Sequence, residues 1–320
     1  MRGIKTIFLS LTCVALVNFQ IEAQDFSIST GANYLYQSDQ NYTDVSIWSN
    51  GGISYNYNIS ETLSLFIDSA VSTEYHLLTG ETDSVVSLHT ETTYRNEPFF
   101  IGINLNPYLK VSLPSKVISG ELEISIPMSL DFFTLAIFLT PRTTLDFEGS
   151  DFKGITLTST DYSIQGGSSF IILDQLLLKP SVETGINSQL TSQTIYIQPQ
   201  IDLSWFSTSI FSFNATLSYK LSESDQLLTE QILFTPQLTY YLARNGITIT
   251  TEIENIYTEK TQASHTLEIN PSINLDYQLT PRATVTLKNT LFNTFTTDYS
   301  TPTITVSAVP FISLSLRYLF

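Results

Sequence analysis

The chain has 320 residues, of which 14% are charged and 12% aromatic, and its formal net charge is -16. So acidic a chain repels nucleic acid, which we therefore exclude as a partner. After the N-terminus no run approaches the roughly 18 apolar residues that a membrane-spanning helix needs, so any membrane span must be built from strands.

The N-terminus has the pattern of a secretory signal peptide. Arg2 and Lys5 form a charged start, residues 7–17 form an apolar run, and Ala23 ends a small-residue cleavage site. We expect residues 1–23 to be the signal and residues 24–320 to be a single domain. Cys13, the only cysteine, lies within the apolar run, so the mature chain would have no disulfide.

Alternation with period two begins at Phe26 and continues to the end of the chain. In the first predicted strand, one face carries Phe26, Ile28, Ala32, Tyr34 and Tyr36, and the other carries Ser27, Ser29, Gly31 and Asn33. The predicted strands meet the requirement of about 9 to 11 residues for a tilted transmembrane strand. Apolar-face aromatics gather near the predicted strand ends, where their amphipathic rings suit the two membrane interfaces.

The connections between strands are of two alternating kinds. Tight turns are predicted near residues 60–62, 96–98, 130–132, 173–175, 206–209, 243–246 and 280–282. Longer polar loops are predicted near residues 37–44, 76–83, 112–117, 142–154, 189–193, 222–226, 258–264 and 294–302. Short turns that alternate with longer outer loops are typical of outer-membrane barrels.

A proline-led pattern repeats at Pro199, Pro236, Pro271 and Pro310, with spacings of 37, 35 and 39 residues. One hairpin per repeat predicts about sixteen strands. Fourteen is the alternative, because residues 142–172 alternate poorly. Proline removes a ladder hydrogen bond, so these four positions are interpreted as bulges or kinks, or as inherited features without a role in transport.

The charged residues test the two faces independently, since a charge at mid-bilayer costs about 2 to 4 kcal/mol. All charges on the predicted strands lie on the face opposite the apolar one, except Glu230. The sequence therefore predicts an all-β fold, a transmembrane antiparallel up-and-down β-barrel with a polar lumen.

The last strand ends with Tyr318 and Phe320, two residues apart and on one face. This resembles the C-terminal assembly signal of the bacterial outer-membrane β-barrel family, whose final strand ends on phenylalanine with an aromatic two residues earlier. The resemblance implies the bacterial outer membrane, outer-membrane lipid as the surroundings, and insertion by the barrel-assembly machinery. It identifies a class and no subfamily.

More than twice as many acids as bases point inward, which favours small cations in an aqueous lumen. We expect a passive, mildly cation-preferring diffusion channel for small hydrophilic solutes, since sixteen-stranded barrels are wide enough for a channel. The predicted pore-lining residues are Asp68, Glu91, Glu121, Glu123, Asp202, Glu252, Glu254 and Glu268. Porins resemble the chain in architecture, but their long inward-folded third loop has no counterpart here, so a constriction must come from residues 142–154 or from lumen side chains.

Three alternatives remain open: a structural or surface-interaction barrel of the adhesin kind, a channel for hydrophobic substrates, and a barrel hydrolase. Short loops disfavour an adhesin, and the absence of a plug segment before Phe26 disfavours a hydrophobic-substrate channel. For a hydrolase, His89 and Glu91 are a possible base and its orienting partner, but such inward polar neighbours are usually structural. We expect no enzyme activity, no cofactor and no metal site.

Overall fold

The computed structural model describes residues 25–37, 42–150, 153–173, 175–206, 210–224, 227–242, 246–260, 264–298 and 304–319. The signal-peptide prediction for residues 1–23 lies outside this part of the chain. The described elements are strands: β1 (Asp25–Gln37), β2 (Tyr42–Asn58), β3 (Leu63–His76), β4 (Thr82–Asn96), β5 (Phe99–Leu113), β6 (Val117–Ser125), β7 (Met128–Phe132), β8 (Leu135–Ser150), β9 (Lys153–Leu173), β10 (Leu176–Gln189), β11 (Gln193–Phe206), β12 (Phe211–Ser224), β13 (Leu227–Leu242), β14 (Ile247–Lys260), β15 (Ser264–Thr280), β16 (Ala283–Asp298) and β17 (Ile304–Leu319).

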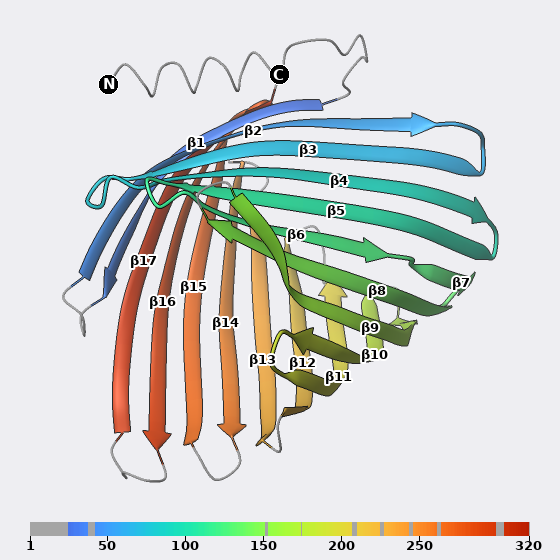
Figure 1. Ribbon diagram of the computed structural model, residues 1–320. Helices are drawn as coiled ribbons and strands as arrows, with labels where there is room; N and C mark the ends of the chain where they lie inside the picture. Colours follow the sequence, from blue (N-terminus) through green and yellow to red (C-terminus); the bar gives the residue numbers. More distant parts are fainter. Residues whose placement is uncertain are drawn as a thin grey trace.

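The strands form one antiparallel sheet in which neighbours in the chain are neighbours in space (Figure 1). The sheet closes because β1 pairs with β17, from Ser27 opposite Leu319 to Leu35 opposite Phe311. Closure removes both edges of the sheet. The predicted all-β up-and-down barrel is confirmed.

The short strands β6 and β7 follow one another in the same place in the barrel and together act as one interrupted strand. Both pair with β5 on one side and with β8 on the other. Across the break, the Gly102 amide donates to the Pro127 carbonyl at 2.7 Å and the Ile126 amide donates to the Pro141 carbonyl at 3.0 Å. Counting β6 and β7 as one strand gives the sixteen strands expected from the hairpin repeat.

Two predicted connections are wrong. Residues 130–132 belong to β7, and the chain turns at residues 133–134 instead. The outer loop expected at residues 142–154 is almost entirely strand, because β8 continues to Ser150 and β9 begins at Lys153. This correction removes the longest stretch from which an inward-folded constriction could have come.

The poor alternation of residues 142–172 has a local cause. The pairing of β8 with β9 shifts register between Asp146 and Phe147 and again between Glu148 and Ser150. Phe147 pairs with Leu157 and Asp146 with Ser159, so Thr158 is an extra residue that reverses the phase of the pattern. A bulge of this kind hides a strand from a strict period-two test.

The repeated prolines are not bulges. At Pro199, Pro236 and Pro271 the ladder to the following strand skips two residue pairs and then resumes in the same register. On their other side, these prolines stay opposite Val182, Ala215 and Ile253. The missing N–H of each proline therefore removes a ladder hydrogen bond and leaves the register unchanged.

The side chains are distributed inside out relative to a water-soluble protein. The most buried side chains among the described residues are almost all polar, with Tyr196 and Ala283 as the apolar exceptions: Ser46, Ser125, Ser159, Ser163, Ser181, Ser212, Ser218, Thr239, Asn270 and Thr290. Large apolar side chains such as Ile137, Ile195 and Leu314 are about half exposed on the outer face. Such a surface suits lipid. Within the described residues, no helix is long and apolar enough to cross a membrane.

Candidate functional site: the polar lining of the lumen

The eight predicted pore-lining acids all lie on strands, on the face opposite the lipid-facing residues. Their surroundings divide them into two groups. Asp68, Glu91, Glu121 and Glu123 lie on β3, β4 and β6, while Asp202, Glu252, Glu254 and Glu268 lie on β11, β14 and β15. The structure does not bring the eight together, and the two groups have different partners.

Asp68, Glu91 and Glu121 have local surroundings on the first wall. Asp68 Oδ1 accepts a hydrogen bond from Ser54 Oγ at 2.6 Å. Glu91 Oε2 lies 3.9 Å from His89 Nε2. Glu121 lies opposite Tyr108 on β5 and opposite Asp146 on β8, so a second carboxylate is its neighbour on one side.

Arg142 on β8 connects carboxylates of two other strands. Its Nη2 lies 2.5 Å from Glu183 Oε1 and its Nη1 lies 3.9 Å from Glu123 Oε2. Its Nε donates to Ser163 Oγ at 3.3 Å. The guanidinium fork can hold several acceptors at once, which a lysine ammonium at this position could not do in the same plane.

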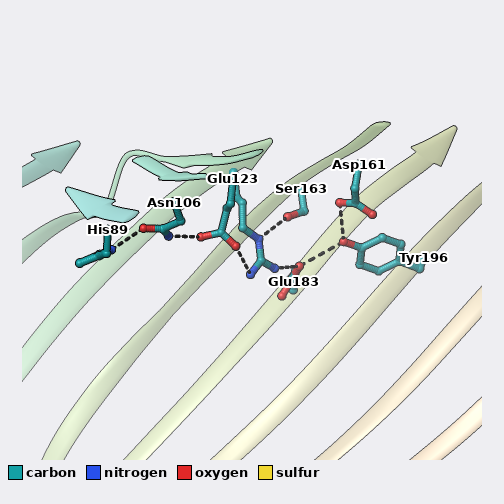
Figure 2. Close-up of polar contacts among 8 residues, drawn as sticks. His89, Asn106, Glu123, Asp161, Ser163, Glu183 and Tyr196 are labelled. Atoms are coloured by element: carbon teal, nitrogen blue, oxygen red, sulfur yellow. Dashed lines mark hydrogen bonds and ion pairs between the residues drawn. The ribbon is translucent and has the colours of Figure 1, made fainter. Parts of the chain in front are cut away.

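Hydrogen bonds extend this cluster in both directions around the barrel (Figure 2). On one side, Glu123 Oε1 accepts from Asn106 Nδ2 at 3.0 Å, and Asn106 Oδ1 in turn contacts His89 Nδ1. On the other side, the Tyr196 hydroxyl lies 3.1 Å from Glu183 Oε1 and 3.2 Å from Asp161 Oδ1. We call these residues the Arg142 network: His89, Asn106, Glu123, Arg142, Asp161, Ser163, Glu183 and Tyr196.

The Arg142 network crosses seven neighbouring strands, from β4 to β11 with β7 outside it. The phenol of Tyr196 has one proton, so it donates to one of its two carboxylates at a time. Lys220 on β12 lies over the Tyr196 ring, with its Nζ 4.4 Å from the centre of the ring. Arg142 thus compensates Glu123 and Glu183, and Lys220 adds a second cation beside Tyr196.

Tyr196 reaches the two carboxylates because the residue opposite it has no side chain. Gly185 on β10 pairs directly with Tyr196 on β11. A Cβ atom at Gly185 would lie 2.6 Å from both Cζ and Oη of Tyr196 and 2.7 Å from the Tyr162 carbonyl oxygen. The same arrangement recurs at Gly31 opposite Trp48 and at Gly167 opposite Phe138. In each pair an aromatic ring covers the backbone of a glycine.

The opposite wall carries acids whose partners are neutral. Asp202 accepts from Gln200 at 2.9 Å and from Thr216 at 2.7 Å. Gln237 donates to Glu252 at 2.8 Å, and Asn270 donates to Glu254 at 3.1 Å. We call the following residues of β11, β14 and β15 the acidic wall: Asp202, Glu252, Glu254, Glu268 and Asp276.

Among the described residues, no lysine or arginine forms an ion pair with the acidic wall. The ion pairs that lysine and arginine form within the described residues involve other acids, namely Asp83, Glu123 and Glu183. Amide and hydroxyl donors orient a carboxylate but leave its charge in place. The acidic wall therefore keeps its negative charge, whereas Asp83, Glu123 and Glu183 are paired with Lys110 or Arg142.

Two of the most connected lumen residues, Arg142 and Trp48, are not among the predicted pore-lining residues. Arg142 falls in the loop predicted at residues 142–154, although Thr140, Arg142, Thr144 and Asp146 alternate with Leu139, Pro141 and Leu145, a pattern that indicates a strand. Trp48 lies between Ser46 and Asn50 on the polar face of β2, where a large aromatic residue is not expected from the alternation. Both residues contact carboxylate or amide partners from neighbouring strands.

The glutamate that points outward also has a partner. Glu230 on β13 lies beside Tyr219 of the neighbouring strand β12. At the C-terminus, Tyr318 is 40% exposed and lies opposite Ile28 and Ala283. Phe320, the other residue of the predicted assembly signal, lies outside the described residues, so that signal stays a prediction.

His89 has no catalytic surroundings in the described part of the chain. Its ring nitrogens face Asn106 and Glu91, and its ring lies 5.7 Å from that of Phe66. No serine or threonine hydroxyl of the described residues hydrogen-bonds to it. No group of three or more His, Cys, Asp or Glu side chains in the described residues could hold a metal ion.

No protein-family model matches the sequence. No curated protein sequence matches it either. Solved structures do match. CdiB from Acinetobacter baumannii is 8% identical with a TM-score of 0.59, over 92% of this chain and 60% of that one. A bacterial polysaccharide outer membrane secretin is 8% identical with a TM-score of 0.52, over 92% of this chain and 98% of that one. OccAB3 of Acinetobacter baumannii is also 8% identical, with a TM-score of 0.49, over 92% of this chain and 99% of that one. The fold is that of bacterial outer-membrane β-barrels, as the sequence predicted.

Proposed function

We propose that this bacterial outer-membrane β-barrel is a passive diffusion channel for small hydrophilic solutes, with a mild preference for cations. The observation that carries the proposal is the acidic wall, where carboxylates face the lumen with amide and hydroxyl partners only. Fixed negative charge along an aqueous path raises the local concentration of cations. In this proposal the barrel-assembly machinery inserts the chain, and the strand-borne acids predicted above line the pore.

The short connections favour a channel over a surface-interaction barrel. Between two and five residues separate consecutive strands at the end of the barrel where β1 connects to β2 and β16 connects to β17. An adhesin presents long surface loops for its partner. The lumen lining, in contrast, carries the unusual concentration of charge in this chain.

Recordings of the purified protein in a planar bilayer test the proposal. Across a tenfold KCl gradient at neutral pH, we expect a permeability ratio of K⁺ over Cl⁻ of roughly two to five, given the excess of lumen acids. The Glu252→Gln, Glu254→Gln double variant is expected to lower that ratio about twofold. The preference should also weaken from 0.1 M to 1 M salt, because the Debye length falls from about 10 Å to about 3 Å.

Glu230→Gln is the matched control for this experiment. It removes one negative charge from the outer face, beside Tyr219, and is expected to leave the permeability ratio unchanged. Absence of conductance would contradict the channel proposal, and preference for Cl⁻ would contradict the role of the acidic wall.

A further inference from the structure

A pocket in the lumen wall lies apart from both the Arg142 network and the acidic wall. It occupies 480 Å³ beside β1 to β5 and β17. Its lining includes Trp48, Asn50, Glu74, Asp83, Tyr108 and Lys110. Small-molecule sites in proteins are typically about 300 to 1,000 Å³ with aromatic walls and a few placed polar groups, so the volume and lining suit a ligand.

Trp48 is fixed in place from two directions. Its Nε1–H donates to Asn33 Oδ1 at 3.2 Å, and Asn33 Nδ2 donates to Glu74 Oε1 at 3.2 Å. Gly31 lies directly opposite on β1, and a Cβ there would come within 2.8 Å of the indole ring. The polar edge of the indole is thus used within the wall, which leaves apolar ring surface for the pocket.

The other side of the pocket is formed by β4 and β5. Tyr108 is 40% exposed, although it lies on the lumen face of β5 between Asn106 and Lys110. Lys110 Nζ lies 2.7 Å from Asp83 Oδ2, so these two charges compensate each other. Glu74 also accepts from Ser46 and is therefore supplied with donors by the wall itself.

These surroundings suit a neutral ligand that carries many hydroxyl groups. A hydroxyl donates and accepts, and the pocket offers both roles: carboxylates and amide oxygens accept, whereas Lys110 and the amide nitrogens donate. With Lys110 compensating Asp83, the remaining charge of the lining is that of Glu74, which opposes an anion and is already hydrogen-bonded to Ser46 and Asn33. The rings of Trp48 and Tyr108 offer apolar surface that an open-chain polyol cannot cover as well as a sugar ring can.

We propose that this pocket is a binding subsite for a small neutral saccharide. The proposal deepens the channel function and rests on it for the route by which the solute arrives. Binding should be weak, with half-saturation on the order of 1 to 10 mM, because a conducting channel must release what it binds.

Tryptophan fluorescence tests the subsite without measuring conductance. Trp48 and Trp205 are the two tryptophans of the chain. Trp205 lies on the outer face at the end of β11, so the Trp205→Phe variant in liposomes reports on Trp48 alone. With maltose or glucose we expect a saturable change in its emission. Mannitol, an acyclic polyol, and choline chloride, a cation, should bind at least about tenfold more weakly.

Variants at Tyr108 test the aromatic contact in the same background. Tyr108→Phe keeps the ring face and should bind maltose within about twofold of its parent, whereas Tyr108→Ala should bind roughly five- to tenfold more weakly. Both must retain barrel circular dichroism and resistance to trypsin. If Tyr108→Ala does not fold, Tyr108→Leu replaces it, with the same weakening expected.

Three results would overturn the subsite: no saturable change with either sugar, mannitol binding as tightly as glucose, or choline binding more tightly than maltose. The two proposals also fail separately. Ion current without sugar binding rejects the subsite and keeps the channel, whereas sugar binding without ion current rejects the channel and keeps a sugar-binding barrel.

Discussion

Alanine in place of Gly185 is expected to lower the free energy of unfolding by about 2 kcal/mol, within the usual cost of overpacking. The added Cβ would lie 2.6 Å from Cζ and Oη of Tyr196, so the ring must move away from Asp161 and Glu183. The loss therefore has two sources, a steric one at the strand pair and a polar one in the Arg142 network. Urea unfolding of the protein in liposomes, followed by tryptophan fluorescence, measures it.

Gly51→Ala provides the matched control. Nothing lies within 4 Å of a Cβ at Gly51, which is also a strand glycine. Replacing it should leave stability unchanged or raise it by up to about 0.5 to 1 kcal/mol, since alanine loses less entropy on folding. A second arm removes the ring: in a Tyr196→Ala background, Gly185→Ala should cost at least about 1 kcal/mol less than it does alone. Equal costs in the two backgrounds would refute the steric explanation.

Glutamine in place of Arg142 is expected to have the second large effect, on stability and selectivity together. The change leaves Glu123 and Glu183 without their cation, and the Glu183 side chain is only 17% exposed. Since the Arg142 side chain is 37% exposed to the lumen, we discount the cost of a broken buried ion pair and expect about 1 to 3 kcal/mol. The two freed carboxylates should also raise the K⁺ over Cl⁻ permeability ratio.

Arg317→Gln separates pairing from net charge. Arg317 lies on the lumen face of β17, and no ion pair of its side chain is found among the described residues. Both variants remove one positive charge from the lumen, so a difference in unfolding free energy reports the paired geometry. If the two variants lose the same stability, the Arg142 network contributes nothing beyond net charge.

Most of the barrel could be predicted from the sequence because its two faces meet opposite solvents. Lipid and water select opposite residue types at successive positions, so period-two alternation and the inward charges of residues such as Asp202 and Glu252 are enough to define strands and faces. The strand number followed from the hairpin spacing. These features depend on local pattern, which a sequence displays directly.

The partners of the lumen charges could not be predicted in the same way. Whether Glu183 meets Arg142 depends on the register of β8, β9 and β10, and the bulge at Thr158 shifts that register by a residue. The same bulge interrupts the alternation of β9, the partner of the strand that carries Arg142. Likewise, the close contact of Tyr196 with Gly185 is a cross-strand property that neither residue reveals alone. Sequence pattern thus assigned the faces, and register decided the chemistry on them.

The pairing of β1 with β17 has a consequence for biogenesis. Its nine residue pairs join the first described strand to the last, across nearly the whole length of the chain. Contacts of such large sequence separation carry the greatest loop-closure entropy and form late. Until the final strand has been synthesised and delivered, every partial product has two open edges, which promote association with other chains. A premature stop anywhere before residue 304 would therefore yield an aggregation-prone sheet instead of a smaller pore.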